Sequence, residues 1–172
     1  MSCQHSSQVG GNTGCEVRAL LQRVTTARVE IEGQVVGEIG HGLLVFLAVY
    51  PEDGDAQVGW LLEKLLDLRV FADAAGRMNL SVREVGGGVL LVSQFTLAGD
   101  TRRGRRPGFS AAAPPAQAEA IYERFLARLQ AAHPRVAAGR FGADMQVHLV
   151  NDGPVTLLVD TPPPAGTSLS PS

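Results

Sequence analysis

LLVFLAVY, residues 43–50, is the stretch of sequence that decides the fold. The run is bounded by Gly42 and Pro51, and its apolar part is far shorter than the roughly 20 residues that a membrane-spanning helix needs. A short apolar run between turn residues is typical of a strand that is covered on both faces. VLLVSQF, residues 89–95, follows three glycines and begins in the same way. The sequence therefore predicts two buried strands.

Weaker patterns around these runs predict the remaining elements. Alternation over residues 17–39, broken at Gly33, predicts an opening hairpin, and residues 139–160 are expected to form a closing hairpin whose turn is NDGP. One helix is expected near Asp55, its predicted N-cap, and a second helix begins at the proline pair 114–115. Their apolar stripes are Val58, Leu61, Leu62, Leu65 and Leu66, and Ala118, Ile121, Tyr122, Phe125 and Leu129. Strands that outnumber two main helices predict a compact, β-rich α+β fold.

Composition indicates one globular domain, because 172 residues with 45% hydrophobic content can bury one core. Both cysteines lie before residue 17 and the four histidines lack a metal-binding spacing, so neither a metal nor a cofactor is expected. The chain has no recognisable secretion signal, and we expect a cytoplasmic protein. Its domain is expected over residues 17–160. The leader at 1–16 is expected to be disordered or the result of a misassigned start, and a disordered Pro/Ser tail is expected at 161–172.

The segment Ser93, Gln94, Phe95 and Thr96 ends a buried strand with hydrogen-bonding side chains. These side chains either satisfy a solvated strand end or present a site. A threonine hydroxyl is a poor nucleophile without a base, and no histidine, lysine or amine lies nearby in the sequence. We therefore expect Thr96 to be a hydrogen-bonding group, with the backbone N–H groups of Phe95 and Thr96 as candidate donors to an oxyanion.

A second segment places four positive charges in five positions, at Arg102, Arg103, Arg105 and Arg106. The formal net charge is only -2, so any attraction for a polyanion has to come from a local patch such as this one. A guanidinium presents a planar fork that suits phosphate. RNA phosphate is the functional interpretation, and an ordinary solvated loop is the alternative.

Arg23 and the segment NDGPVT at 151–156 are the remaining unusual features. Strand alternation places Arg23 on the same face as Ala19 and Leu21, where a buried guanidinium needs acceptors such as the backbone carbonyls of a fixed turn. The alternative is that the strand ends at Gln22. Gly153 and Pro154 give the turn a specified shape, and from the residues alone that shape is either structural or chemical.

Taken together, these segments resemble the D-aminoacyl-tRNA deacylases. The resemblance covers Val17 to Asp160 and rests on motifs in the family's order: ALLQRV, VGEIGHGLLVFLAV, VSQFTL, DTRRGRRPGF, GRFGADMQV and NDGPVTLLVD. It implies a homodimer that hydrolyses the ester between tRNA and a D-amino acid or glycine. The implied partner is the acceptor end of aminoacyl-tRNA, and neither a membrane, DNA nor a cofactor is implied.

The resemblance also implies roles for particular residues. Ser93, Gln94, Phe95 and Thr96 would form the catalytic pocket for the aminoacyl-adenosine end. Selectivity would come from a cis Gly-Pro motif that enters the partner's pocket and rejects L-amino acids. The residues that match this second group are Gly153 and Pro154 themselves, Asn151 at the start of the motif, Arg23 holding the Gly-Pro carbonyls, and Met145 lining the pocket.

Two other functions compete with this interpretation. An esterase that uses Thr96 as its nucleophile would form a covalent acyl intermediate. A non-catalytic RNA-binding module would explain the arginines but neither SQFTL nor NDGPVT, and the sequence lacks the interleaved aromatic residues that such modules use for stacking.

Overall fold

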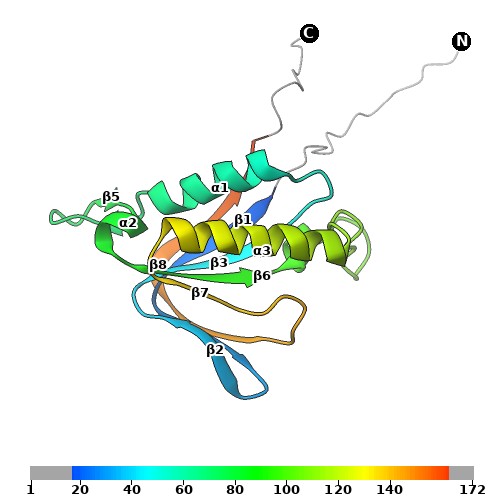
Figure 1. Cartoon of the computed structure of the whole chain (residues 1–172), viewed down its shortest axis with the longest axis horizontal. Coiled ribbons are helices and arrows are strands. Elements are labelled where there is room, and N and C mark those ends of the chain that lie inside the picture. The colour runs from blue at the N-terminus through cyan, green and yellow to red at the C-terminus, as the bar shows by residue number, and fades with distance from the viewer. Residues whose placement is uncertain (1–16, 163–172) are drawn as a thin grey trace, which may run out of the picture.

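A six-stranded sheet organises the computed structural model, which describes residues 17–162 (Figure 1). The leader expected at 1–16 lies outside the described residues. The strand order is β2-β1-β3-β6-β7, with β8 also paired to β1. Pairs β3–β6 and β6–β7 are parallel, and the other pairs of this sheet are antiparallel. The strands are β1 (Arg18–Ile31), β2 (Gln34–Ile39), β3 (Gly42–Ala48), β6 (Gly88–Ser93), β7 (Val136–Ala138) and β8 (Gln146–Asp160).

Two helices lie side by side over one face of this sheet, α1 (Asp55–Asp67) and α3 (Pro115–Ala132) (Figure 1). Both were predicted, and every residue of their predicted apolar stripes is buried. The N-cap of α1 is Gly54 rather than Asp55, because the Gln57 side chain accepts the Gly54 N–H. The short elements are β4 (Phe71–Ala72), β5 (Met78–Leu80), α2 (Val82–Val85) and the 3₁₀ turn η1 (Phe95–Ala98), of which the sequence analysis missed the last three. Among the described residues, no helix combines the length and apolarity needed to span a membrane.

The core has two parts, one on each face of the central strands. The larger part lies between the sheet and the helices, and the smaller part lies on the opposite face, where β1 and β2 curl over the sheet. Consecutive residues Leu43 and Leu44 belong to different parts, as do Leu90 and Leu91. The prediction that β3 and β6 are covered on both faces is therefore confirmed.

The predicted closing hairpin is wrong, because β8 is one continuous strand along β1. Gln22 pairs with Thr156 and Val24 with Asn151, so residues 152–155 lie opposite the single residue Arg23. NDGP is therefore a bulge within a strand and not a reversal of the chain. A bulge suits Pro154, which has no N–H to contribute to the ladder.

The folded domain also extends beyond its predicted end at Asp160. Thr161 is nearly inaccessible to solvent, with 1% of its surface exposed, and its backbone N–H donates to the carbonyl of Val17 at 3.1 Å. Val17 is itself fully buried in the larger part of the core. Thr161 therefore belongs to the domain rather than to the expected tail, of which residues 163–172 lie outside the described residues.

The start of the parallel pair β3–β6 requires glycine. A Cβ on Gly42 would overlap the carbonyl oxygen of Gly88, whereas a Cβ on Gly40 would meet nothing within 4 Å. We expect Gly42→Ala to lower the free energy of unfolding by about 2 kcal/mol, because the backbone has to move. The control Gly40→Ala should change it by less than about 0.5 kcal/mol. Urea unfolding measures both, and equal effects would contradict this close approach.

Candidate active site

The SQFT segment lies where the two parallel central strands end. Ser93, the last residue of β6, pairs with Leu47 of β3, and the Gln94 N–H donates to the Leu47 carbonyl at 2.8 Å. The chain then leaves the sheet, and residues from Phe95 onward form η1. The carboxyl ends of parallel strands are a common place for ligand sites in α/β sheets.

The Thr96 hydroxyl is bonded to its neighbour in the motif. The Gln94 side-chain amide donates to Thr96 Oγ1 at 2.5 Å. None of the side-chain hydrogen bonds found in the described residues connects this hydroxyl to a histidine, a carboxylate or an amine. Among the described residues, the hydrogen-bond partner found for this hydroxyl is therefore an amide, which cannot act as a base.

Backbone N–H groups at the start of η1 are oriented by the turn. The Leu97 N–H donates to the Gln94 carbonyl at 3.2 Å, and the Gly99 N–H donates to the Thr96 carbonyl at 3.0 Å. Phe95 and Thr96 begin the turn, and the first N–H groups of a helix have no acceptor within it. These two N–H groups therefore have no acceptor within the turn, and their role as oxyanion donors stays a prediction.

A cavity of about 480 Å³ adjoins this turn. Phe95 is 58% exposed at its edge, and its ring meets that of Phe109 edge to face with the centroids 5.2 Å apart. The loop before α3 forms another wall of the cavity. The cavity is lined by Ser93, Phe95, Phe109, Ser110, Ala112, Ala113, Pro114, Pro115, Ala118, Phe141 and Gly142.

Arg18 connects the two ends of the folded domain to this turn. Sequence reasoning missed this residue. Its Nε and NH2 donate to the Asp160 carboxylate at 2.7 and 3.2 Å, and its NH1 donates to the Leu97 carbonyl at 3.4 Å. Arg18 and Asp160 are paired across β1 and β8. No local pattern reveals a contact between residues at opposite ends of the domain.

The Gly153–Pro154 bulge is held at its neck and exposed at its tip. The Asn151 Nδ2 donates to the carbonyls of Arg23 at 3.0 Å and Val155 at 3.1 Å. Val155 is buried, whereas Gly153 and Pro154 are exposed and joined by a cis peptide bond. Asn151 thus closes the bulge, and Val155 anchors it in the core.

Arg23 points inward as strand alternation predicted, and its side chain is 12% exposed. Its expected partners were the carbonyls of Gly153 and Pro154. In the described chain its Nε lies 2.9 Å from Asp152 Oδ2, and its NH1 donates to the Val70 carbonyl at 2.5 Å. Arg23 therefore supports the bulge through the Asp152 carboxylate rather than through the Gly-Pro carbonyls.

The structure does not bring the two halves of the expected site together within one chain. Arg23, opposite the bulge, pairs with Leu43, whereas Ser93 pairs with Leu47. Four residues along β3 span about 13 Å. The bulge also lies on β8, whose only paired neighbour among the described strands is β1.

Met145, which was expected to line the pocket, does not border the cavity beside Ser93. It packs against the smaller part of the core, and its sulfur fills the space beside Gly139. It also borders a separate cavity of about 580 Å³, together with Glu30 and Arg140. Its role in lining a substrate pocket therefore stays a prediction.

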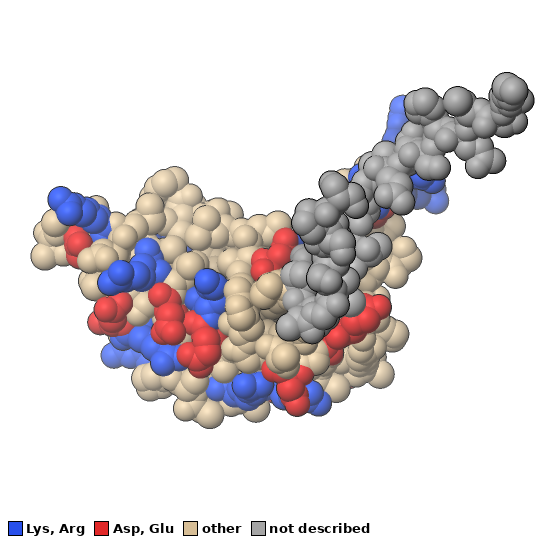
Figure 2. Space-filling model, turned by 90° about the horizontal axis from the view of Figure 1, so that it is seen from above, with Lys and Arg blue, Asp and Glu red and all other residues tan. Residues whose placement is uncertain are grey.

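The arginine loop is exposed, and its four guanidinium groups differ in whether they form an ion pair. Arg102 forms a salt bridge with Asp100, with 2.7 Å between NH2 and Oδ2. None of the ion pairs found in the described chain involves Arg103, Arg105 or Arg106. Acidic and basic side chains are interspersed over the face seen in Figure 2.

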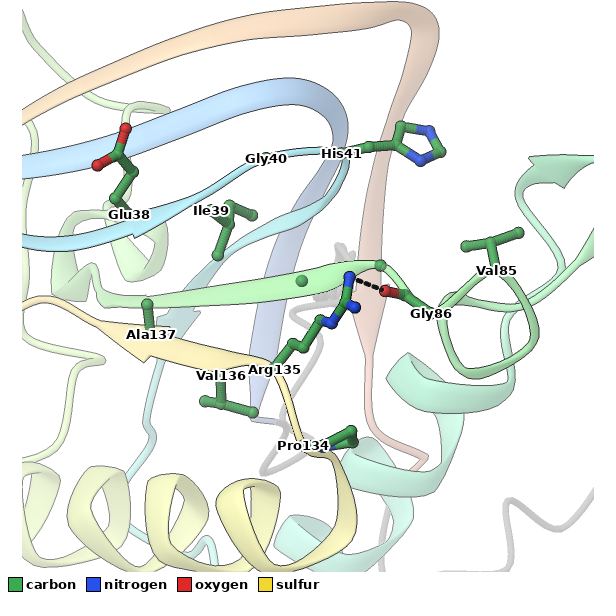
Figure 3. Close-up of a pocket in the computed structure, with 12 residues that line it drawn as sticks. Glu38, Ile39, Gly40, His41, Val85, Gly86, Pro134, Arg135, Val136 and Ala137 are labelled. Atoms are coloured by element: carbon green, nitrogen blue, oxygen red, sulfur yellow. Dashed lines mark hydrogen bonds between the residues drawn. The ribbon is translucent and has the colours of Figure 1, made fainter.

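A further cavity of about 440 Å³ lies at the opposite end of β6 (Figure 3). None of the predicted site residues borders it. Its polar groups bond to one another: Arg135 NH1 donates to the Gly86 carbonyl at 3.0 Å, and the Gly88 N–H donates to the His41 carbonyl at 3.0 Å. These bonds hold the entry to β6 in place.

The fold and the site define a class: an α+β enzyme with a 3₁₀ turn at the end of its central strands and a cavity walled in part by Phe95, Phe109 and Phe141. The family model described as D-Tyr-tRNA(Tyr) deacylase matches residues 20–160. The chain belongs to this family.

Individual relatives agree with this assignment. A protein of Pseudomonas paraeruginosa, named D-aminoacyl-tRNA deacylase, is 61% identical over 144 residues, which are 84% of this chain and 99% of the relative. A solved structure described as a c-Myc DNA unwinding element binding protein has a TM-score of 0.80 and 40% identity, over 84% of this chain and 99% of the other. A probable eukaryotic D-amino acid tRNA deacylase has a TM-score of 0.76 over the same shares at 19% identity, and it supports the fold alone.

The Arg18–Asp160 pair provides a test of how the chain ends are joined to the site. Both side chains are partly buried, at 29% and 33% exposure. We expect Arg18→Met and Asp160→Asn each to lower the free energy of unfolding by about 1 kcal/mol. In the double variant the losses should fall short of additivity by at least about 0.5 kcal/mol, because both substitutions remove one interaction. Fully additive losses in urea unfolding would contradict the pairing.

Proposed function

We propose that this protein hydrolyses the ester that joins a D-amino acid, or glycine, to the 3′ end of tRNA, releasing the free amino acid and tRNA. The observation that carries the proposal is the SQFT turn of a chain of the deacylase family: its first two N–H groups have no acceptor within the turn, and its residues Ser93 and Phe95 line a cavity of about 480 Å³, whereas Gln94 and Thr96 do not border it. The relatives named D-aminoacyl-tRNA deacylase support the same substrate class. The cytoplasm, where translation takes place, is the proposed location.

The chemical step requires a polarised ester carbonyl and a water molecule. With the carbonyl oxygen on the N–H groups of Phe95 and Thr96, water adds to the carbonyl carbon and the bond to the ribose oxygen breaks. One proton of the water goes to the ribose oxygen, the other is released to solvent, and the amino acid leaves as its carboxylate. Each oxyanion donor of this kind contributes about 3 kcal/mol to the stability of a transition state. In this scheme the Thr96 hydroxyl positions the substrate, and the ribose 2′-OH can assist the water.

Chiral selection needs a group that meets the α-carbon of the substrate. In the proposed homodimer, the bulge of one protomer enters the cavity of its partner and directs the Gly153 and Pro154 carbonyls at that carbon. An L side chain would collide with them, whereas a D-amino acid presents hydrogen there and glycine has no side chain to exclude. The exposure of the bulge, and its separation of about 13 Å along β3 from the SQFT turn, favour insertion into a second copy.

The outer edge of β8 is suited to such a second copy. Among the described strands, β8 pairs with β1 alone, which leaves its other edge open. Apolar side chains are exposed along it, at Val150, Leu157 and Leu158. An open strand with apolar side chains is a ready surface for association. A two-fold dimer would bring each bulge to the partner in the same way.

The alternative functions explain less of the geometry. An esterase with Thr96 as nucleophile requires a base, and the described contacts of its hydroxyl include only the Gln94 amide. An RNA-binding module would use the free arginines of the exposed loop but leaves the cavity without a role.

The proposed activity is tested with tRNA charged separately with D-tyrosine, L-tyrosine or glycine. We expect rapid loss of the D-tyrosyl and glycyl esters while the L-tyrosyl ester is spared. Thr96→Val should slow D-ester cleavage only about tenfold, the effect of losing one hydrogen bond. A loss of about ten-thousandfold in the variant, together with an acyl-enzyme trapped in the wild type, would identify Thr96 as a nucleophile. Equal cleavage of the D and L esters would contradict chiral selection.

Gly153→Ala tests the role of the bulge in cleavage without changing the stability of the fold. A Cβ on Gly153 would meet only the Asn151 side-chain oxygen, at 3.6 Å, so the fold accommodates it. We expect the free energy of unfolding to change by less than about 0.5 kcal/mol. Cleavage of D-tyrosyl-tRNA should fall at least about tenfold, since the methyl group would occupy space reserved for substrate in the partner's cavity. An unchanged rate would show that the bulge does not approach the substrate.

A further inference from the structure

The arginine loop is closed at its neck by backbone hydrogen bonds. The Asp100 N–H donates to the Gly108 carbonyl at 2.7 Å, and the Gly108 N–H donates to the Asp100 carbonyl at 2.9 Å. Residues 101–107 lie beyond this bridge, and Gly104 has a φ of +71°, which favours glycine. The loop therefore has a defined base and a turning point between its two arginine pairs.

The Asp100 carboxylate adds a side-chain clasp above this neck. It accepts three bonds from one residue: the backbone N–H of Arg102 at 3.0 Å, its Nε at 2.8 Å and its NH2 at 2.7 Å. These bonds, first from the Arg102 side chain and then from its backbone, hold the pKa of the Asp100 carboxyl well below its usual range. The carboxylate thus stays ionised in neutral solution and fixes the direction in which the loop leaves its base.

The same neck is connected to the cavity wall. Phe109 follows Gly108 directly, lines the cavity, and packs edge to face on Phe95. The clasp thus lies between the free guanidinium groups of Arg103, Arg105 and Arg106 and the place proposed for the aminoacyl end. A fixed distance between the free guanidinium groups and the cavity suits aminoacyl-tRNA, because its backbone phosphates follow directly after the aminoacylated 3′ end.

We propose that Asp100 is a positioning residue for the acceptor end of tRNA: it neutralises Arg102 and holds the loop so that the other three arginines meet phosphates at a set distance from the cavity. This inference rests on the proposed function. It assigns Arg102 to the loop structure, whereas the sequence analysis placed it among the phosphate-binding residues.

Asp100→Asn distinguishes positioning from simple charge attraction, because the two explanations predict opposite changes in tRNA affinity. The substitution removes a negative charge beside the arginines, so charge alone predicts tighter tRNA binding. Loss of the clasp predicts weaker binding despite the added positive charge. Asp67→Asn is the matched control: it makes the same charge change and removes an ion pair with Arg83, near the start of β6 rather than its end. The length of β6 separates the two places by about 20 Å.

The experiment measures the dissociation constant of uncharged tRNA at several salt concentrations for the wild type and both variants. We expect Asp100→Asn to raise it about tenfold and to flatten its salt dependence, since fewer phosphates are met at once. Asp67→Asn should stay within about twofold of the wild type. With D-aminoacyl-tRNA, Asp100→Asn should raise KM and leave kcat unchanged. Equal or tighter binding by Asp100→Asn would overturn the inference.

Asp100→Glu provides a second test that leaves the net charge unchanged. The extra methylene displaces the carboxylate, so we expect weaker tRNA binding from geometry alone; wild-type binding would overturn the inference. Binding of uncharged tRNA does not depend on hydrolysis. A wild type that binds tRNA but cleaves no D-ester would therefore refute the proposed function separately, whereas a wild type that binds no tRNA would overturn the role of the loop.

Discussion

The pairing of β8 with β1 is the constraint on which the rest of the structure depends. It runs from Gln146 opposite Glu30 to Asp160 opposite Arg18, and so joins the two ends of the domain. At one end it places the Arg18 guanidinium between the Asp160 carboxylate and the carbonyl of Leu97. In its middle it forces four residues to lie opposite Arg23, which creates the exposed Gly-Pro bulge. One ladder thus holds the SQFT turn and displays the proposed selectivity element.

The candidate site depends on backbone more than on reactive side chains. The N–H groups at the start of η1 are set by the 3₁₀ turn, and the bulge is set by Asn151 and by the contact between Arg23 and Asp152. Such groups are fixed before the substrate arrives, which is the condition for strong electrostatic stabilisation of a transition state. A backbone filter also leaves a D side chain unconstrained, so the proposed enzyme would accept D-amino acids of different size.

The sequence predicted what depends on local periodicity and missed what depends on distant contacts. The apolar runs identified β3 and β6, and helical spacing identified α1 and α3. Gly-Pro chemistry marks an interruption but does not say whether the chain reverses, so the bulge was mistaken for a hairpin turn. Alternation placed Arg23 inward, but its partner Asp152 depends on the shape of that bulge. The Ser81–Glu84 capping box was a readable signal for α2, whereas nothing local signals the Arg18–Asp160 pair.

The central claim is that two chains complete each site, and subunit complementation tests it most directly. Ala112→Trp would fill the cavity, and Gly153→Ala would alter the bulge, so each variant alone should cleave D-tyrosyl-tRNA poorly. After the two variants are unfolded and refolded together, a mixed dimer would hold one intact cavity facing one intact bulge. The account predicts recovery of up to about a quarter of wild-type activity, since half of the dimers are mixed and each has one good site. No recovery in verified mixed dimers would contradict it.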